Sequence, residues 1–394
     1  MAFTDRNKPF SFFTIHNKVA LVRGGAAYFG LLEKMITEAT TTIHLQVYIF
    51  DADETGKKIA TALMDAAKRN VKVYLMADGY ASQSLPENFI QQIIASGINF
   101  RFFESVFKGS NFYFGRRLHH KLVVVDNATA MVGGINISNH YNDMPDAPAW
   151  LDFALYVEGE IVKELCVLCW KTWKGYKPVT SFEPCNQPAL KHAYGAEEMA
   201  DVRMRRNDWV RQKNQISKTY IEMMMSATSQ ISILCSYFLP GNIMRKNIKK
   251  AVKRGVKIKV IMAGKSDVVI AKNAERFMYD WLLRNKVEIF EYQPNVLHGK
   301  IAVCDSKWMT IGSYNLNDIS AYASIELNLD VRNEVFAKQA EQTLDGIILN
   351  DCRQVTTESH IRSKNILKQF SRWVSYEIFR LSFNLFTFYF KQKG

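Results

Sequence analysis

The sequence predicts an α/β fold of two repeated α-β-α sandwich halves, related by a pseudo-two-fold axis, with the active site at their interface. The pattern His-x-Lys-x4-Asp-x6-Gly-[Gly/Ser]-x-Asn occurs twice, at residues 119–136 and 298–315. The strands and helices expected before the first copy recur in the same order before the second. In addition, residues 67–73 (AKRNVKV) are echoed by residues 252–258 (VKRGVKI). The chain is therefore an internal duplication in which each half carries one motif.

The first half is expected at residues 17–175, after an irregular arm at 1–16. Short apolar runs rich in β-branched residues predict buried strands, and longer amphipathic runs predict helices. The predicted strands are 43–50, 71–77 and 100–103, and the predicted helices are 28–40, 56–69 and 88–95. A proline-containing linker at residues 176–200 follows.

The second half, residues 201–350, repeats this order. Its predicted strands are 231–238, 256–262 and 287–292, and its predicted helices are 218–229, 242–254 and 274–283. Residues 351–394 differ in character, because they combine basic and aromatic residues. The sequence thus indicates a separate carboxyl-terminal tail.

Each motif supplies groups that suit a phosphodiester. His119 and Lys121 are two residues apart, so on a strand they share a face, and the same holds for His298 and Lys300. Ammonium and amide groups can hold the non-bridging phosphate oxygens as charge develops. The predicted catalytic set is His119, Lys121, Asp126, His298, Lys300 and Asp305, and the predicted substrate-binding set is Asn136, Asn315 and Ser313.

The two motif histidines need opposite protonation states, because one must attack phosphorus and the other must protonate the leaving alcohol. Each histidine should have a carboxylate on its other ring nitrogen. Asp152 and Glu326 are the candidates, since each begins an apolar run after a motif. His120 points to the other face of the strand. The remaining histidines are interpreted as structural: His16, His44, His140, His192 and His360.

Composition favours an anionic partner. The net charge is +13 and the isoelectric point is near 9.3, which points to membrane lipid or nucleic acid. The close pair Cys166 and Cys169 lies in an apolar helical run and is expected as buried free thiols, so a reducing compartment is the default. The amino terminus does not resemble a signal peptide, which favours a cytosolic location.

Three segments are candidates for contact with lipid. The connection at residues 104–117 carries aromatic and basic residues, among them Arg116 and Arg117, and is expected as a lipid-facing loop or as an ordinary packed loop. Two basic sets are read as solvated faces or as headgroup contacts: Arg203, Arg205, Arg206 and Arg211, and Lys249, Lys250, Lys253, Arg254, Lys257 and Lys259. The tail carries an apolar helical stripe from Leu367 to Phe388, which predicts an interfacial helix or a helix docked on the core.

The duplicated motif resembles the phospholipase D superfamily, so the halves are expected to be phospholipase D-like. The segments Tyr48–Asp53, Asp78–Tyr80, Leu297–Lys300 and Glu326–Asn328 narrow the resemblance to bacterial cardiolipin synthases of the short B type, over residues 17 to 355. This family lacks the two amino-terminal membrane spans of the longer synthases. The resemblance implies that His119 is the nucleophile and His298 the general acid. Two positions depart from the family pattern: His120 stands where the family often has Arg, and Asn315-Leu316-Asn317-Asp318 differs from the usual Asn-Leu-Asp.

The sequence thus predicts a phosphatidyltransferase that makes cardiolipin and glycerol from phosphatidylglycerol through a phosphohistidine. No metal, cofactor or obligate protein partner is expected. The expected location is the cytoplasmic side of the inner membrane, as a peripheral protein on an anionic surface. The alternatives are hydrolysis of phospholipid or nucleic acid by the same site, with nucleic acid disfavoured by the aromatic tail, and a non-catalytic membrane-binding protein.

Overall fold

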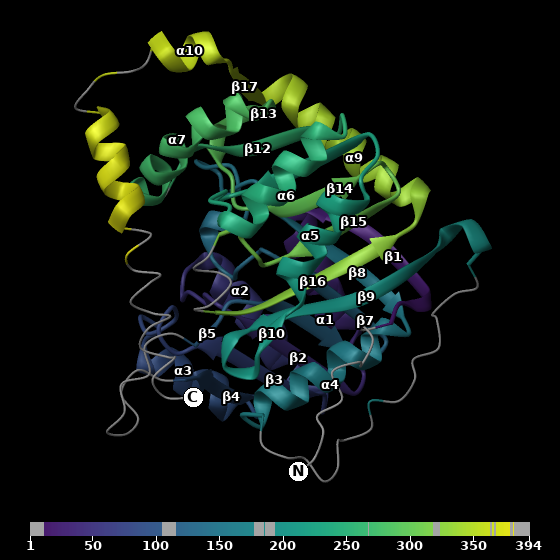
Figure 1. Ribbon diagram of the computed structural model, residues 1–394. Coiled ribbons are helices and arrows are strands. Elements are labelled where there is room, and N and C mark those ends of the chain that lie inside the picture. The colour runs from purple at the N-terminus through teal and green to yellow at the C-terminus, as the bar shows by residue number, and fades with distance from the viewer. Residues whose placement is uncertain are drawn as a thin grey trace, which may run out of the picture.

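The fold was analysed in a computed structural model that describes residues 12–104, 116–176, 185, 194–266, 268–317, 324–362, 365, 368–378 and 381. Two halves with the same order of elements lie against each other (Figure 1). The first half contains β1 (Thr14–Arg23), α1 (Ala26–Glu38), β2 (Thr42–Val47), α2 (Glu54–Lys68), β3 (Lys72–Asp78), α3 (Glu87–Ala95), β4 (Asn99–Phe103), β5 (Arg117–Leu118), β6 (Lys121–Val125), β7 (Thr129–Gly133), β8 (Phe153–Gly159) and α4 (Ile161–Trp173).

The second half repeats this order. It contains β9 (Met199–Asp208), β10 (Lys213–Asn214), α5 (Gln215–Ser226), β11 (Gln230–Cys235), α6 (Asn242–Lys253), β12 (Lys257–Lys265), α7 (Val269–Arg284), β13 (Val287–Val296), β14 (Lys300–Cys304), β15 (Trp308–Gly312), β16 (Ser324–Arg332), α9 (Glu334–Asp351), β17 (Cys352–Val355) and α10 (Thr357–Arg362). The predicted duplication and α/β class are confirmed by this correspondence, in which β9 matches β1 and α9 matches α4.

Strand pairing shows the same symmetry. In the first half the order is β4-β3-β2-β6-β7-β8-β1, with β2, β3 and β4 parallel and the other neighbours antiparallel. In the second half it is β9-β16-β15-β14-β11-β12-β13-β17, with β11, β12 and β13 parallel. Antiparallel pairing of β1 with β9 joins the two halves at their first strands.

Three large apolar cores hold these layers together. One core packs α1, α2 and α3 on the outer face of the first sheet, and a second packs α5, α6 and α7 on the second sheet. The third lies between the halves and combines residues of both sheets with α4 and α9. It contains Leu122 and Val124 of β6 together with Ile301 and Val303 of β14, so the two motif strands share one core. Burial of this apolar surface is what fixes one half against the other.

Both ends of the described chain carry strands that the sequence did not predict. β1 begins at Thr14, inside the segment expected as an irregular arm. β17 pairs with β13 through Ile289 and Val355, so residues 352–355 complete the second sheet although they were expected in the tail. β17 is an edge strand, whereas β1 pairs on both sides, with β8 and with β9, and neither run shows a strong alternating pattern. Among the described residues, no helix combines the length and apolar character that crossing a bilayer requires.

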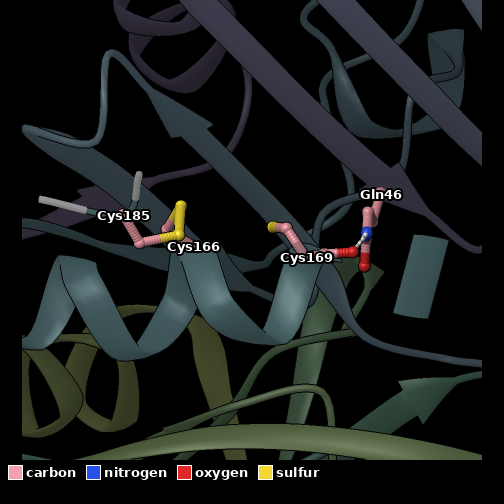
Figure 2. Close-up of a disulfide and its surroundings, with 4 residues drawn as sticks. All are labelled: Gln46, Cys166, Cys169 and Cys185. Carbon is pink, nitrogen blue, oxygen red and sulfur yellow. Dashed lines mark hydrogen bonds between the residues drawn. A yellow bond between two sulfur atoms is a disulfide. The ribbon is translucent and has the colours of Figure 1, made fainter. Parts of the chain in front are cut away.

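The prediction of two free thiols in α4 was wrong for one of them. Cys166 forms a disulfide with Cys185, from the connection between the halves, whereas Cys169 is a buried free thiol (Figure 2). The two cysteines are a helical turn apart but project differently, and the backbone carbonyl of Cys169 accepts a hydrogen bond from the Gln46 amide at 2.9 Å. The sequence separation of 19 residues gave no sign of this pairing, because chain folding alone brings Cys185 back onto the helix.

Several arginines proposed to face solvent or lipid are buried in ion pairs instead. Arg203 and Arg205 on β9 each place Nε within 3.1 Å of Asp330 Oδ2 on β16. Arg116 donates to Asp208 at 2.9 Å and stacks on Tyr176. A buried charge needs such a partner, since desolvation without one costs several kcal/mol. The rest of the expected lipid-facing loop, residues 105–115, lies outside the described residues.

Candidate active site

The first motif histidine lies where the two halves meet. His119 lies between β5 and β6, and β5 pairs in parallel with the start of β16 from the second half. The backbone N–H of His119 donates to the carbonyl of Ile325 at 3.1 Å. Correspondingly, the backbone N–H of His298 donates to the carbonyl of Leu151 at 2.8 Å. Each histidine is therefore held by the backbone of the opposite half, one residue before that half's candidate carboxylate.

The carboxylates complete this exchange between halves. His119 Nδ1 lies 2.9 Å from Glu326 Oε2, and His298 Nδ1 lies 2.7 Å from Asp152 Oδ2. Both carboxylates are fully buried. Burial raises the pKa of Glu326, but the adjacent His119 outweighs it and holds that pKa below the ordinary value. For Asp152 burial likewise acts upward, and Lys300 and His298 bring the pKa down. Ionised carboxylates accept from Nδ1–H, which leaves each Nε2 for chemistry.

Each motif lysine lies beside the histidine of its own motif. Lys121 Nζ donates to the carbonyl of His119 at 2.6 Å. Lys300 Nζ donates to Ser236 Oγ at 3.1 Å, lies 3.0 Å from His298 Nδ1, and also bonds the carbonyl of His298. Each lysine also acts on the other motif's histidine, because the positive charge of Lys300 lowers the pKa of His119 and that of Lys121 lowers the pKa of His298. The two motifs thus form one cluster.

Burial sets the protonation of this cluster in the absence of substrate. It lowers the pKa of His119, and the neighbouring lysines add to the effect against the opposing pull of Glu326. It lowers the pKa of His298 to about 4, with Lys300 as the next cause. Burial also lowers the pKa of Lys121 to about 7, against the charge of Glu326. Both imidazoles are therefore neutral near pH 7, and the cluster gains most from an anion that restores its positive charge.

The predicted substrate-binding residues have different surroundings. Asn136 accepts from the N–H of Ile49 at 3.1 Å and donates to Tyr141 Oη at 2.8 Å. Asn315 Oδ1 lies 4.0 Å from Cys235 Sγ. Ser313 donates its hydroxyl to Glu326, so the structure gives it a role in holding that carboxylate in place of the predicted contact with substrate.

The motif aspartates lie away from the histidines, which corrects their inclusion in the catalytic set. Asp126 follows β6, five residues beyond Lys121 and roughly 16 Å along the strand. Its carboxylate accepts from the N–H groups of Thr40, Thr41 and Thr42 at 2.8–2.9 Å. Asp305 holds the N–H groups of residues 228–230 in the same way. Burial acts to raise the pKa of Asp305, but these N–H donors lower it to about 2. Both aspartates fix the turn that precedes the first parallel strand of their half.

Four residues around the histidines were not among the predicted site residues. The ring of Tyr48 lies 4.9 Å from that of His119, and Lys121 Nζ lies 5.1 Å from the same tyrosine ring. The ring of Tyr141 lies 5.2 Å from that of His298. Asp78 accepts from the N–H of Leu118 at 2.8 Å, and Ser236 accepts from Lys300. Tyr48, Asp78 and Ser236 each stand at or just beyond the carboxyl end of a parallel strand, and that position was the available signal.

Comparison with known proteins assigns this chain to a family. The family described as "Cardiolipin synthase, PLD-like domain" matches residues 32–146 and 220–348. Cardiolipin synthase B of Salmonella typhimurium is 33% identical over 341 residues, which cover 86% of this chain and 82% of that protein. The chain belongs to this family. Cardiolipin synthase B of Escherichia coli K12 is 32% identical with the same coverage. The cardiolipin synthase of Halalkalibacterium halodurans is 30% identical over 82% of this chain and 63% of that protein.

Solved structures confirm the predicted fold. The phosphatidylserine synthase of Haemophilus influenzae superposes with a TM-score of 0.74 and 12% identity, over 94% of this chain and 96% of that one. The polyphosphate kinase of Porphyromonas gingivalis superposes with a TM-score of 0.60 and 14% identity, over 93% of this chain and 53% of that one. Both likenesses concern the fold. The family membership and the two-halved phospholipase D-like fold predicted from the sequence are therefore confirmed.

Proposed function

We propose that this protein is a cardiolipin synthase-like phosphatidyltransferase that works through a phosphohistidine. The observation that carries the proposal is the paired arrangement of two histidines, His298 buried and His119 partly buried, each bonded at Nδ1 to a carboxylate of the opposite half, with Lys121 and Lys300 beside them. The relatives named cardiolipin synthase support cardiolipin as the product.

His119 is the nucleophile in this proposal. Because its Nδ1–H donates to Glu326, the lone pair is on Nε2, and its lowered pKa keeps the ring neutral near pH 7. Nε2 attacks phosphorus, a nitrogen–phosphorus bond forms, and the bond from phosphorus to the glycerol oxygen breaks. The departing oxygen takes a proton from Nε2 of His298. The products of this step are glycerol and a phosphatidyl-histidine.

His298 becomes protonated when the substrate binds. Without a ligand, burial and the lysine charges hold the pKa of His298 at about 4. A phosphodiester anion seated on Lys121 and Lys300 offsets those charges and raises that pKa, so His298 becomes the acid once substrate is bound. In the second step neutral His298 takes the proton of an incoming hydroxyl. The new oxygen–phosphorus bond forms as the nitrogen–phosphorus bond breaks, which regenerates His119.

Lys121, Lys300, Asn136 and Asn315 hold the phosphate in this scheme. Protonated lysines stabilise the extra negative charge of the pentavalent transition state. Among the described residues, no three or more His, Cys, Asp or Glu side chains form a group that could hold a metal ion. The protein acts on lipid at an anionic membrane surface, which its net charge of +13 favours, and we place it at the cytoplasmic side of the inner membrane as a peripheral protein.

The decisive experiment is product analysis with purified protein and phosphatidylglycerol vesicles. Release of glycerol in equal amount to cardiolipin is the expected result. Phosphatidic acid as the main product would assign the same site to hydrolysis, with water in place of the second lipid. No lipid product at all, together with cleavage of a nucleic acid phosphodiester, would overturn the lipid assignment.

A further inference from the structure

A basic cavity lies on the second half, outside the catalytic cluster. Its volume is about 590 Å³, within the roughly 300–1,000 Å³ of small-molecule sites. It is lined by residues of α7, β13, β17 and α10 and by the helix at residues 368–378, which we call the tail helix. Figure 1 shows the tail helix in yellow beside α7. None of the lining residues belongs to either motif.

Cations from three segments converge on this cavity. They are Arg276 of α7, Arg353 of β17, and Lys368 and Arg372 of the tail helix. Glu291 is the acidic residue of the lining, and it is already paired with Arg353 at 2.7 Å, with Arg276 at 3.5 Å and with buried Lys272 at 3.4 Å. Among the described residues, no carboxylate lies within 4 Å of Lys368 or Arg372. The cavity therefore has an excess of positive charge that an anion would balance.

Repulsion within the cavity is visible in Arg372. Burial lowers its pKa, and the positive charge of Arg276 lowers it further, against the opposing effects of Tyr279, Glu291 and Asp280. The tail helix thus brings a cation toward another cation. A bound anion would convert this repulsion into two attractions, as arginine clusters do with phosphate.

The tail helix packs Ser375 and Tyr376 toward the protein and exposes large apolar side chains together with Lys368, Gln369 and Ser371. Lys368, Arg372, Ser375 and Tyr376 share one face by helical spacing. Ser375 is buried, and the ring of Tyr376 lies 4.8 Å from that of Phe277 on α7. On the side away from Ser375, Phe370 is 62% exposed and Trp373 is 45% exposed. A surface helix in water normally turns its large apolar side chains inward, so these exposed rings fit an apolar phase outside the protein.

We propose that this cavity binds the phosphodiester headgroup of an anionic phospholipid, while the outer face of the tail helix lies in the apolar layer of the same membrane. The polar side of an interfacial helix lies at the depth of the lipid phosphates. Lys368 and Arg372 would meet a phosphate there, with Arg276 and Arg353 on its other side. The proposal deepens the proposed function, since it gives a lipid-using enzyme a second lipid site that takes no part in the chemistry.

Vesicle binding by the full-length protein tests this site. The variant K368Q/R372Q should bind phosphatidylcholine vesicles containing phosphatidylglycerol roughly tenfold or more weakly than wild type, because each basic residue near an anionic surface contributes substantially. The matched control is K246Q/K250Q on α6, which removes the same charge at the same spacing from exposed positions. An equal loss in both variants would show that general surface charge is responsible, and would overturn the proposal.

Four further measurements complete the test. The charge-preserving variant K368R/R372K should keep wild-type binding, which separates the effect from misfolding. Trp373→Phe should remove the part of the fluorescence blue shift that vesicles induce, because Trp373 enters the apolar layer. If soluble glycerophosphoglycerol binds the cavity as well as vesicles do, the ligand of the cavity is a free phosphate ester. That result would overturn the proposal of a lipid ligand. Turnover of detergent-dispersed substrate by K368Q/R372Q should stay at wild-type level. This measurement therefore distinguishes a defect in vesicle binding from a defect in the proposed reaction.

Discussion

At the scale of single residues, the protonation of four buried side chains decides the chemistry. His119 and His298 are chemically identical, yet one must attack and the other must donate a proton. Among other differences in their surroundings, Lys300 lies 3.0 Å from His298 Nδ1, whereas Lys121 bonds the backbone carbonyl of His119. Burial is the main cause that lowers the pKa of His298 before substrate arrives, and the charge of Lys300 is the next.

The first prediction concerns the covalent intermediate. His119→Ala should lower turnover roughly 10⁴-fold or more, because no other group can form the nitrogen–phosphorus bond. His298→Ala should be similarly slow overall, because it loses the acid of the first step and the base of the second, but label from phosphatidylglycerol that does transfer should remain on His119 after an acid-free quench. Mass analysis locates the label. Label on His298 in the His119→Ala variant would reverse the two roles.

A second prediction follows from the pKa of Lys121, which burial lowers to about 7. The free enzyme binds an anion best when this lysine is charged, so kcat/KM should fall as the pH rises through about 7. In Lys121→Arg the guanidinium stays charged, and this alkaline decline should move to higher pH even though overall activity is reduced. Lys250→Arg on the surface serves as the control. An unchanged alkaline decline in Lys121→Arg would assign it to another group.

At the scale of elements, each motif joins a catalytic end to a structural end by one strand. Lys121 stands at the start of β6 and Asp126 just beyond its end, where it fixes the turn that leads into β2. The pairing of β2 with β6 makes this turn and the catalytic end parts of one rigid ladder. The spacing from Lys to Asp that the two motifs of this chain share thus reflects the length of a strand.

The third prediction is that Asp126→Ala affects stability more than chemistry. Loss of the acceptor for three N–H groups should lower the free energy of unfolding by about 1–2 kcal/mol, as for removal of a helix cap. Asp126→Asn keeps one acceptor and should lose less. Thermal melting and kcat of the folded fraction are the two measurements. A loss of kcat of roughly a hundredfold in folded Asp126→Ala would return this residue to the catalytic set.

The fourth prediction concerns the tail. The three large cores end with Val355 among the described residues, and the tail helix adds Tyr376 to the small cluster of Leu239, Ala274 and Met278. Deletion of residues 367–394 should therefore leave the melting temperature and detergent-based turnover largely intact while it abolishes binding to anionic vesicles. Unfolding of the truncated protein would show that this small cluster is essential to the core. Full vesicle binding would place the anchor elsewhere, with the segment at residues 104–117 as the next candidate.

At the scale of the whole molecule, the interface between halves is what completes the active site. Glu326 of the second half orients His119 of the first, and Asp152 of the first half orients His298 of the second. Neither half by itself contains a motif histidine together with the carboxylate that orients it. The central core that joins β6 and β14 therefore contributes to catalysis by fixing these distances.

The fifth prediction uses this exchange. Glu326→Gln should slow formation of the phosphohistidine by roughly 10²–10⁴-fold, because the wrong tautomer of His119 becomes available. Asp152→Asn should instead act through His298, with its larger effect on breakdown of the intermediate by the acceptor. Rapid-quench measurement of both steps separates the two. Equal effects of each variant on both steps would show that the carboxylates act on the cluster as a whole.

The sequence alone determined the fold class, the duplication and the motif residues, because all three depend on local periodicity and spacing. His119 and Lys121 share a strand face whatever the rest of the chain does. Asp152 and Glu326 were also found from their position after each motif. Strand and helix order followed from apolar runs, except at the edges, where β1 extends to Thr14 and β17 adds a last strand.

Only the tertiary structure decided which groups meet. The crossing of Glu326 to His119, the pairing of Cys166 with Cys185 and the burial of Arg203 against Asp330 join residues distant in sequence. Asp126 was predicted to be catalytic as part of the motif, but an extended strand carries it roughly 16 Å beyond Lys121. Such contacts are set by the packing of two halves around a shared apolar core, and apolar burial is non-directional, so local patterns do not specify them.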